Sequence, residues 1–110
     1  MIEIGSISEG TLRNCDLIPT YINFIVENDS DVDSAEELLH EWPSELVDLV
    51  NEWLNGAETP ASRELQFYVD MLDFELWTIL MELAPDGLWF GSHIGDGALI
   101  GFWPNDRLEY

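Results

Sequence analysis

TPASRELQFYVDMLDFELWTILMEL, residues 59–83, is the stretch that tells most about the fold. Its main apolar stripe recurs at helical spacing and consists of Leu65, Tyr68, Val69, Leu72, Leu76, Ile79, Leu80 and Leu83. Thr59 with Pro60 is a helix-start signal, because proline is tolerated in the first turn of a helix. Ala84-Pro85-Asp86-Gly87 interrupts the pattern. We therefore predict a long helix that starts at Thr59 and ends near Leu83.

The same stretch carries a second apolar stripe on its opposite side. This stripe consists of Phe67, Met71, Phe74 and Met81. A helix that is apolar on two faces is usually buried between other elements. We expect this helix to be sandwiched inside the fold, although its outer face could instead form a homodimer interface.

Upstream of this helix, the chain predicts a strand and a first helix. Ile2, Ile4 and Ile7 alternate roughly as in a short strand. Asp16 is the expected N-cap of the following helix, with Pro19 in its first turn. The apolar face of that helix consists of Leu17, Ile18, Tyr21, Ile22 and Ile25.

The middle of the chain predicts helical structure with a break. Ser34 and Glu37 form an S-x-x-E capping box that starts a helix. Pro43 should kink or restart that helix, because proline lacks an N–H and crowds the preceding turn. The apolar stripe then continues through Leu46, Leu49, Val50, Trp53 and Leu54. Asn55-Gly56 is expected to stop it.

The C-terminal stretch LWFGSHIGDGALIGFWP, residues 88–104, is typical of a β-hairpin. Two aromatic-rich runs flank Gly95-Asp96-Gly97, whose glycines are expected to supply positive φ angles at the turn. The first strand should pair with the hairpin, because two isolated strands are only marginally stable. The predicted fold is a single α+β domain of residues 1–110. It has an N-terminal strand, three to four helices and a C-terminal β-hairpin that form a small antiparallel sheet.

The charge of the chain limits its partners. Its 110 residues include 23 Asp and Glu against three Arg and no Lys, a formal net charge of −20. A hydrophobic content of 46% argues against a disordered acidic tail. Such a charge disfavours nucleic acid, anionic membranes and acidic substrates, and favours a basic surface. Adaptation to high salt is an alternative, because salt screens the repulsion.

The sequence also carries signals of location. The N-terminus lacks the basic start and apolar run of a signal peptide, and no apolar stretch approaches the length of a membrane span. Cys15 is the only cysteine, so an internal disulfide cannot form. We expect a cytoplasmic protein.

Several patterns look like catalytic or metal sites but lack necessary parts. Asp29, Asp31 and Asp33 match the start of a calcium loop, yet Ser34 and His40 occupy the places of its glycine and its bidentate glutamate. The glycine-rich segment 91–97 does not contain the Lys that a phosphate-binding loop requires. Ser92, His93 and Asp96 cannot form a triad if adjacent strand residues point to opposite faces. We therefore expect no catalytic residue, metal or cofactor, and no enzyme activity.

An acidic stripe is the strongest functional signal. Glu37, Glu41, Glu45, Asp48 and Glu52 are spaced by four, four, three and four residues. On a nearly continuous helix they would share one face about 22 Å long. Such a row is comparable with the phosphates of a nucleic-acid strand. We interpret these five carboxylates as the residues that bind a basic groove built for DNA or RNA. A solvated helix face is the simpler alternative.

Two segments resemble a known group of proteins. GTLRNCDLIP, residues 10–19, and FGSHIGDGALIGFWP, residues 90–104, resemble small acidic phage and bacterial proteins with GTLR, DLIP and FG-x-H-x-GDG…FGFW patterns. No functional residues can be carried over from that group to this chain, but its association with phages favours an anti-defence role. In charge and size the chain is also similar to DNA-mimic anti-restriction and anti-CRISPR proteins.

These observations favour an acidic inhibitor that covers the nucleic-acid-binding surface of a nuclease complex in a bacterial host. An immunity protein or antitoxin that neutralises a cationic nuclease toxin is the alternative. A halophilic domain and a metal-binding protein are further classes that the charge alone allows.

Overall fold

A computed structural model describes residues 2–93 and 95–104 of the chain. Within these residues the helices are α1 (Asn14–Asn28), α2 (Ala35–Leu39), α3 (Ser44–Leu54) and α4 (Arg63–Leu83). The strands β1 (Gly5–Ser8), β2 (Leu88–His93) and β3 (Asp96–Pro104) form an antiparallel sheet in the order β1-β3-β2. The predicted α+β fold is confirmed, including the pairing of the N-terminal strand with the C-terminal hairpin.

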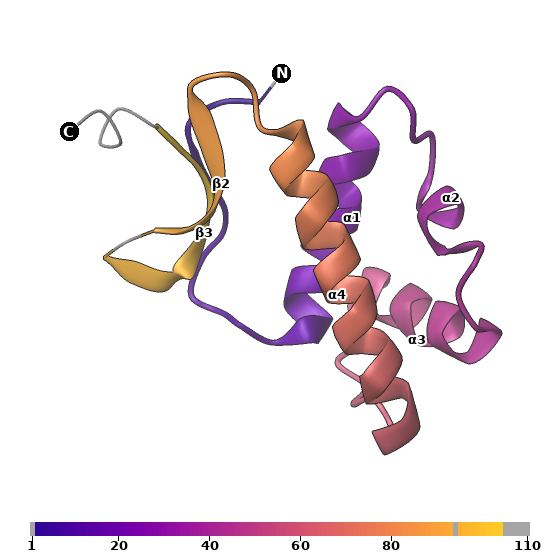
Figure 1. The fold of residues 1–110 in the computed structure, drawn as a ribbon. Helices are drawn as coiled ribbons and strands as arrows, with labels where there is room; N and C mark the ends of the chain where they lie inside the picture. Colours follow the sequence, from indigo (N-terminus) through magenta and orange to yellow (C-terminus); the bar gives the residue numbers. More distant parts are fainter. Residues whose placement is uncertain (1, 94, 105–110) are drawn as a thin grey trace.

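The elements are arranged in three layers (Figure 1). The sheet lies on one side, α1 and α4 cross in the middle, and α2 and α3 lie on the other side. The buried hydrophobic side chains of all three layers form one cluster. The two central helices therefore hold the sheet and the α2–α3 segment in one body.

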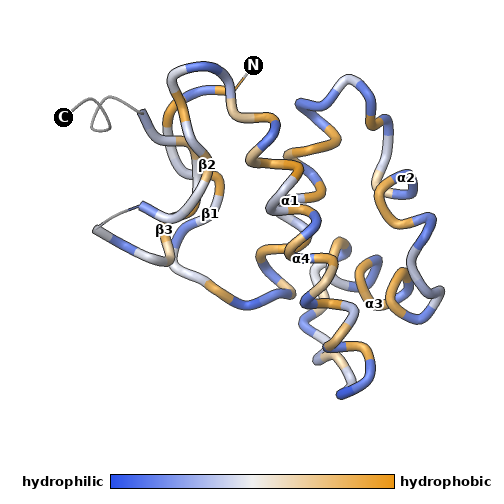
Figure 2. Tube along the Cα trace, in the orientation of Figure 1, coloured by the Kyte–Doolittle hydropathy of each residue, from blue (hydrophilic) through white to orange (hydrophobic). Residues whose placement is uncertain are grey.

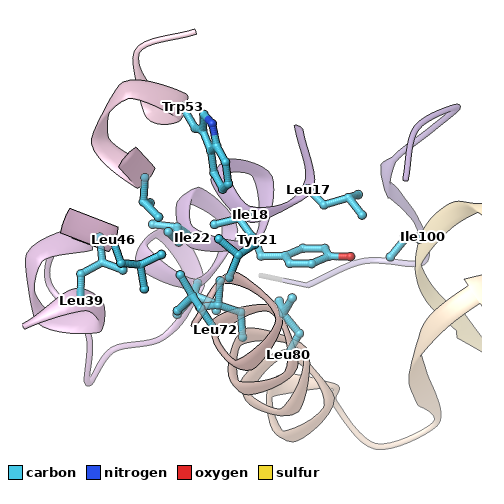
Figure 3. Close-up of a cluster of buried hydrophobic side chains, with 14 of the residues drawn as sticks. Leu17, Ile18, Tyr21, Ile22, Leu39, Leu46, Trp53, Leu72, Leu80 and Ile100 are labelled. Atoms are coloured by element: carbon cyan, nitrogen blue, oxygen red, sulfur yellow. The ribbon is translucent and has the colours of Figure 1, made fainter. Parts of the chain in front are cut away.

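The core consists of the faces that helical spacing predicts, except that Tyr68 of the predicted α4 stripe is exposed. In α1 the buried residues are Leu17, Ile18, Tyr21, Ile22 and Ile25, and in α4 they are Val69, Leu72, Leu76 and Leu80. Figure 3 shows Tyr21 reaching from α1 past Leu80 of α4 toward Ile100 of β3. Edge-to-face contacts join Tyr21 to Trp77 at 6.1 Å and Trp77 to Phe90 at 4.7 Å between ring centroids. Aromatic packing thus connects both central helices to the sheet.

The outer stripe of α4, by which we mean Phe67, Met71, Phe74 and Met81, is not sandwiched. These side chains are 65%, 46%, 73% and 54% exposed, respectively. The expectation of a helix buried on both faces is therefore wrong. α1, α3 and β2 contact α4, but none of them covers this stripe. Hydrophobic and hydrophilic residues alternate along the whole of α4 (Figure 2).

The starts of two helices differ from those predicted. α4 begins at Arg63, and its N-cap is Ser62, whose Oγ accepts a hydrogen bond from Leu65 N at 3.2 Å. The Thr59 carbonyl lies outside the helix and accepts a hydrogen bond from Trp53 Nε1 at 2.7 Å. α1 begins at Asn14, so Asp16 lies in its first turn and does not cap it. The Asp16 carboxylate instead accepts hydrogen bonds from Thr11 and Arg13.

Two details of these helices also correct the prediction. Pro19 lies inside α1, beyond its first turn. Ser34 occupies the N-cap position of α2, but its side chain makes no capping hydrogen bond, so the predicted capping box does not form. The predicted end of α3 is confirmed, because Asn55 is its C-cap and Gly56 follows with a φ of 95°.

The sheet differs from the prediction at two points. β1 starts at Gly5, so Ile2 and Ile4 precede it, and Ile4 is exposed. β2 ends at His93 and β3 begins at Asp96, which places the connection at residues 94–95; residue 94 lies outside the described residues. Gly97 therefore belongs to a strand and does not have the positive φ that was expected of it. Two of the three expected turn residues, Asp96 and Gly97, are therefore strand residues.

None of the described helices combines the length and the hydropathy needed to cross a membrane.

Candidate partner-binding surface

The five residues of the predicted acidic stripe come from three segments. Glu37 belongs to α2, Glu41 lies in the link between α2 and α3, and Glu45, Asp48 and Glu52 belong to α3. All five side chains are exposed. The structure therefore brings them to the surface, but not onto one helix.

Pro43 separates these segments. Its ring would clash with the carbonyl of the residue four positions earlier in a helix, which is Leu39, and α2 ends at Leu39. Pro43 is then the N-cap of α3. The predicted restart at Pro43 is confirmed, whereas the nearly continuous helix assumed for the acidic stripe is wrong. On α3 alone, the carboxylates at 45, 48 and 52 share a face about 10 Å long.

These carboxylates have no cation beside them in the part of the chain that the structure describes. The ion pairs among residues 2–93 and 95–104 are those of Arg13 with Asp16 at 2.8 Å and with Glu58 at 2.7 Å. Neither involves the acidic stripe. Glu52 Oε1 accepts a hydrogen bond from Thr59 Oγ1 at 2.9 Å, which fixes that side chain against the loop before α4. The negative charge of α3 is therefore presented to solvent uncompensated.

A hollow lies beside this charge, between α2 and α3. Its volume is about 350 Å³, and it is lined by Glu36, Leu39, His40, Trp42, Ser44, Val47, Asp48 and Asn51. An adjoining hollow of about 520 Å³ is lined by Ser34, Glu36, Glu37 and His40. Lys and Arg side chains can bury their apolar stem while the charged head group stays in water. Trp42 and Val47 can hold such a stem, and Glu36 and Asp48 can pair with its head.

Sequence reasoning missed Glu36, His40 and Trp42 as parts of this surface. His40 Nδ1 lies 2.9 Å from the carbonyl oxygen of Glu37, which holds its ring beside the hollow. Trp42 lies directly before Pro43 and is only half-buried. A large aromatic residue in a short acidic link is the signal that could have identified it.

The residues considered for catalysis are engaged locally. His93 Nδ1 accepts a hydrogen bond from Gly95 N at 3.0 Å, and its ring packs edge-on against Trp103 at 4.9 Å between centroids. Asp96 Oδ1 accepts a hydrogen bond from Ala98 N at 3.0 Å. His93 and Asp96 thus stabilise the end of the hairpin, and among the described residues no side-chain hydrogen bond joins Ser92 to either of them.

The segment with Asp29, Asp31 and Asp33, which matches the start of a calcium loop in sequence, forms a turn. Asp29 follows α1 as its C-cap, and its Oδ1 accepts a hydrogen bond from Asp31 N at 2.9 Å. Over residues 2–93 and 95–104, no group of three or more His, Cys, Asp or Glu side chains is arranged to hold a metal ion.

In the part of the chain that the structure describes, the carboxyl groups of Asp73 and Asp16 have a shifted pKa. Burial raises the pKa of Asp73, and the negative charge of Asp70 raises it further. Asp73 Oδ1 is buried and has no hydrogen-bond partner among the described residues. Burial and the charge of Asp73 also raise the pKa of Tyr21. By contrast, hydrogen bonds from Thr11 and then from Arg13 lower the pKa of Asp16.

Comparison of the chain with protein-family models, with curated proteins and with solved structures finds no match in any of the three.

Proposed function

We propose that this protein is an acidic inhibitor that occupies the basic nucleic-acid-binding surface of a nuclease complex, as anti-restriction and anti-CRISPR proteins of phages do. The observation that supports this most is the uncompensated carboxylate surface of α2, the following link and α3. It comprises Glu37, Glu41, Glu45, Asp48 and Glu52, all exposed and none paired with a cation of the described chain. The inhibitor acts by competition and not by catalysis.

The physical basis is charge and shape together. Opposite charge steers two proteins into contact, and it also favours partners whose own surface is basic. The α3 carboxylates are one helical turn apart, about 5–6 Å, which is comparable with a nucleic-acid strand that carries one charge per ~3.4 Å of axis. The hollow beside them, with Trp42 in its lining, adds a place for a Lys or Arg side chain that a plain acidic helix would lack.

A competition assay tests this proposal. The protein is used to pull down its partner from a host that carries defence systems, and labelled nucleic acid is titrated against it on the purified partner. The wild type should displace nucleic acid. A variant with Glu41→Gln, Glu45→Gln, Asp48→Asn and Glu52→Gln keeps its shape and should not.

A matched control separates the acidic surface from net charge. Glu3→Gln, Glu9→Gln, Glu27→Gln and Asp86→Asn remove the same number of exposed charges elsewhere. This control should still compete. If both variants compete equally, or if protein and nucleic acid bind the partner together, nucleic-acid mimicry by this surface is wrong. Recovery of a cognate toxin in place of a defence complex would identify the protein as an immunity protein.

A further inference from the structure

The outer stripe of α4 has the spacing of a coiled-coil seam. Phe67, Met71, Phe74 and Met81 fall at d, a, d and d positions of a seven-residue repeat, and Thr78 fills the remaining a position. The Thr78 hydroxyl donates a hydrogen bond to the Phe74 carbonyl at 2.9 Å, so its donor is satisfied within the helix. The stripe covers about 21 Å along the helix axis. An exposed apolar face of this kind marks an interaction surface.

Three of the five residues at the e and g positions beside this seam are acidic, and the other two are Tyr68 and Trp77. In the same register Asp70 is a g position, and Glu75 and Glu82 are e positions; all three side chains are exposed. Side chains at e and g pair across a helical interface and decide which partner fits. In a parallel pair of two copies, Asp70 would face Glu75 of the second copy, and in an antiparallel pair like positions would face each other. Like charges at these positions oppose self-association.

A hollow opens on the same face. Its volume is about 540 Å³, and it is lined by Trp42, Phe67, Asp70, Met71, Phe74 and Glu75. Its apolar wall accepts an aliphatic or aromatic side chain, and its two carboxylates attract a cation beside that side chain. Methionine is flexible and polarisable, which lets such a face adapt to the side chains of a partner helix.

We propose that the outer stripe of α4 binds an amphipathic partner helix whose apolar seam is flanked by Lys or Arg. Helix-in-groove recognition reads anchors at this spacing. The charge of Asp70, Glu75 and Glu82 selects a basic helix and disfavours a second copy of this chain. The proposal goes beyond the acidic inhibitor described above and does not depend on nucleic-acid mimicry, because its anchors and flanking charges lie on α4; Trp42 is the residue that lines both hollows.

Designed peptides test the proposal on the full-length protein. A fluorescent peptide of about three heptads carries Leu at a and d and Lys at e and g. One control peptide has Ser at a and d with the same lysines, and another has the same leucines with Glu at e and g. We expect the Leu–Lys peptide to bind by fluorescence anisotropy at 0.15 M salt. Both controls should bind at least about tenfold more weakly.

Protein variants locate the binding site. Met71→Ser with Phe74→Ser should weaken binding of the Leu–Lys peptide by about tenfold or more, because both side chains are central anchors. The substitutions lie on an exposed face, and an unchanged helical circular dichroism spectrum checks the fold. Asp48→Asn with Glu52→Gln on α3 should leave peptide binding unchanged, even if those residues prove necessary for competition with nucleic acid.

Any of four results would overturn the proposal. The Ser–Lys peptide could bind as tightly as the Leu–Lys peptide, which would mean attraction by charge alone. Binding could be absent, or insensitive to Met71→Ser with Phe74→Ser. Finally, sedimentation could show a dimer that these two substitutions dissociate, and the occupant of the face would then be a second copy of the chain.

Discussion

Asp73 is held in surroundings that disfavour its charged form. Burial raises its pKa above that of an exposed carboxyl, with Asp70 adding to the shift. Below the unfolded-state pKa of about 3.9 both states are protonated, and Asp73 costs nothing. As the pH rises through the higher folded-state pKa, the native carboxylate ionises and stability is lost. Periodicity could not reveal this, because Asp73 reads as one polar residue among several on α4.

We therefore expect Asp73→Asn to raise the melting temperature at pH 7 by several degrees and to have little effect near pH 3. About 1 kcal/mol shifts the midpoint of a domain of this size by roughly 4–8 °C. Asp48→Asn is the control for the general relief of repulsion, since Asp48 is exposed. A gain no larger than that of the control at pH 7 would contradict the assignment.

Gly101 allows two strands to approach each other. It lies in the central strand β3, where it pairs with Ser6 of β1 and with Gly91 of β2. A Cβ atom at this position would lie 2.5 Å from Ser6 Cα and would also clash with the Gly5 carbonyl oxygen. These contacts are with backbone, which cannot rotate away. The sequence marks Gly101 only as one glycine in a strand pattern.

Gly101→Ala should destabilise the protein by about 1–3 kcal/mol in urea unfolding, as overpacking does. Gly97→Ala is the matched control, because a Cβ there meets nothing within 4 Å and the φ angle is not positive. Its stability should equal or exceed that of the wild type. Equal stability of the two variants would show that β1 moves away without cost.

The break at Pro43 shows how far pattern reading extends. A proline in a helical pattern predicts that the helix stops, and α2 does end four residues before it. The spacing of Glu37, Glu41 and Glu45 by four residues suggested a common face only because a continuous helix was assumed. How α2 and α3 lie relative to each other depends on the packing of Leu39 and Leu46 into the core. That tertiary packing is not encoded in spacing.

The two faces of α4 provide a direct comparison of burial. Leu76 is fully buried, whereas Phe74 is 73% exposed, although both belong to apolar stripes of the same helix. Leu76→Ala should cost about 2–5 kcal/mol in urea unfolding, through lost burial and a cavity. Phe74→Ala should change stability by no more than about 0.5 kcal/mol, as surface substitutions do. A large loss for Phe74→Ala would mean that its face is covered in solution. If Leu76→Ala did not lower stability, the placement of α4 in the core would be wrong.

The main apolar stripe of α4, the apolar face of α1 and the hairpin were predictable from the sequence. Burial of one face gives each of them a regular spacing of apolar residues. The exposure of the outer stripe was not. A stripe of Phe and Met at helical spacing has the same sequence pattern whether it is buried inside the fold or exposed at the surface. The difference depends on which layers the other elements form, and here the sheet and α3 leave that face of α4 open (Figure 1). The five acidic residues were correctly expected at the surface, but their arrangement was not.

The described residues keep their charge away from the core, apart from the partly buried carboxyl group of Asp73. No charged side chain is fully buried among the described residues, and the buried cluster is entirely hydrophobic with Tyr21 as its one hydroxyl group. We therefore expect a folded protein even at 0.01 M salt, where the Debye length is about 30 Å. Its melting temperature should rise gradually to 0.15 M salt, as screening shortens that length to about 8 Å. Circular dichroism melts measure this. Unfolding at low salt with recovery only at molar salt would instead support a halophilic domain.

Association with a basic partner should depend on salt in a way that identifies the acidic surface. Long-range attraction acts before contact, so it raises the association rate and is screened by salt, whereas dissociation depends on short-range contacts. We expect the association rate, measured by stopped flow on the purified partner, to fall steeply as salt increases above 0.1 M. Neutralising Glu41, Glu45, Asp48 and Glu52 should lower the rate at low salt and flatten this dependence. The variant neutralised at Glu3, Glu9, Glu27 and Asp86 loses the same net charge, and its rate should stay closer to that of the wild type. Equal slopes for the two variants would mean that net charge, and not the α2–α3 surface, steers the encounter.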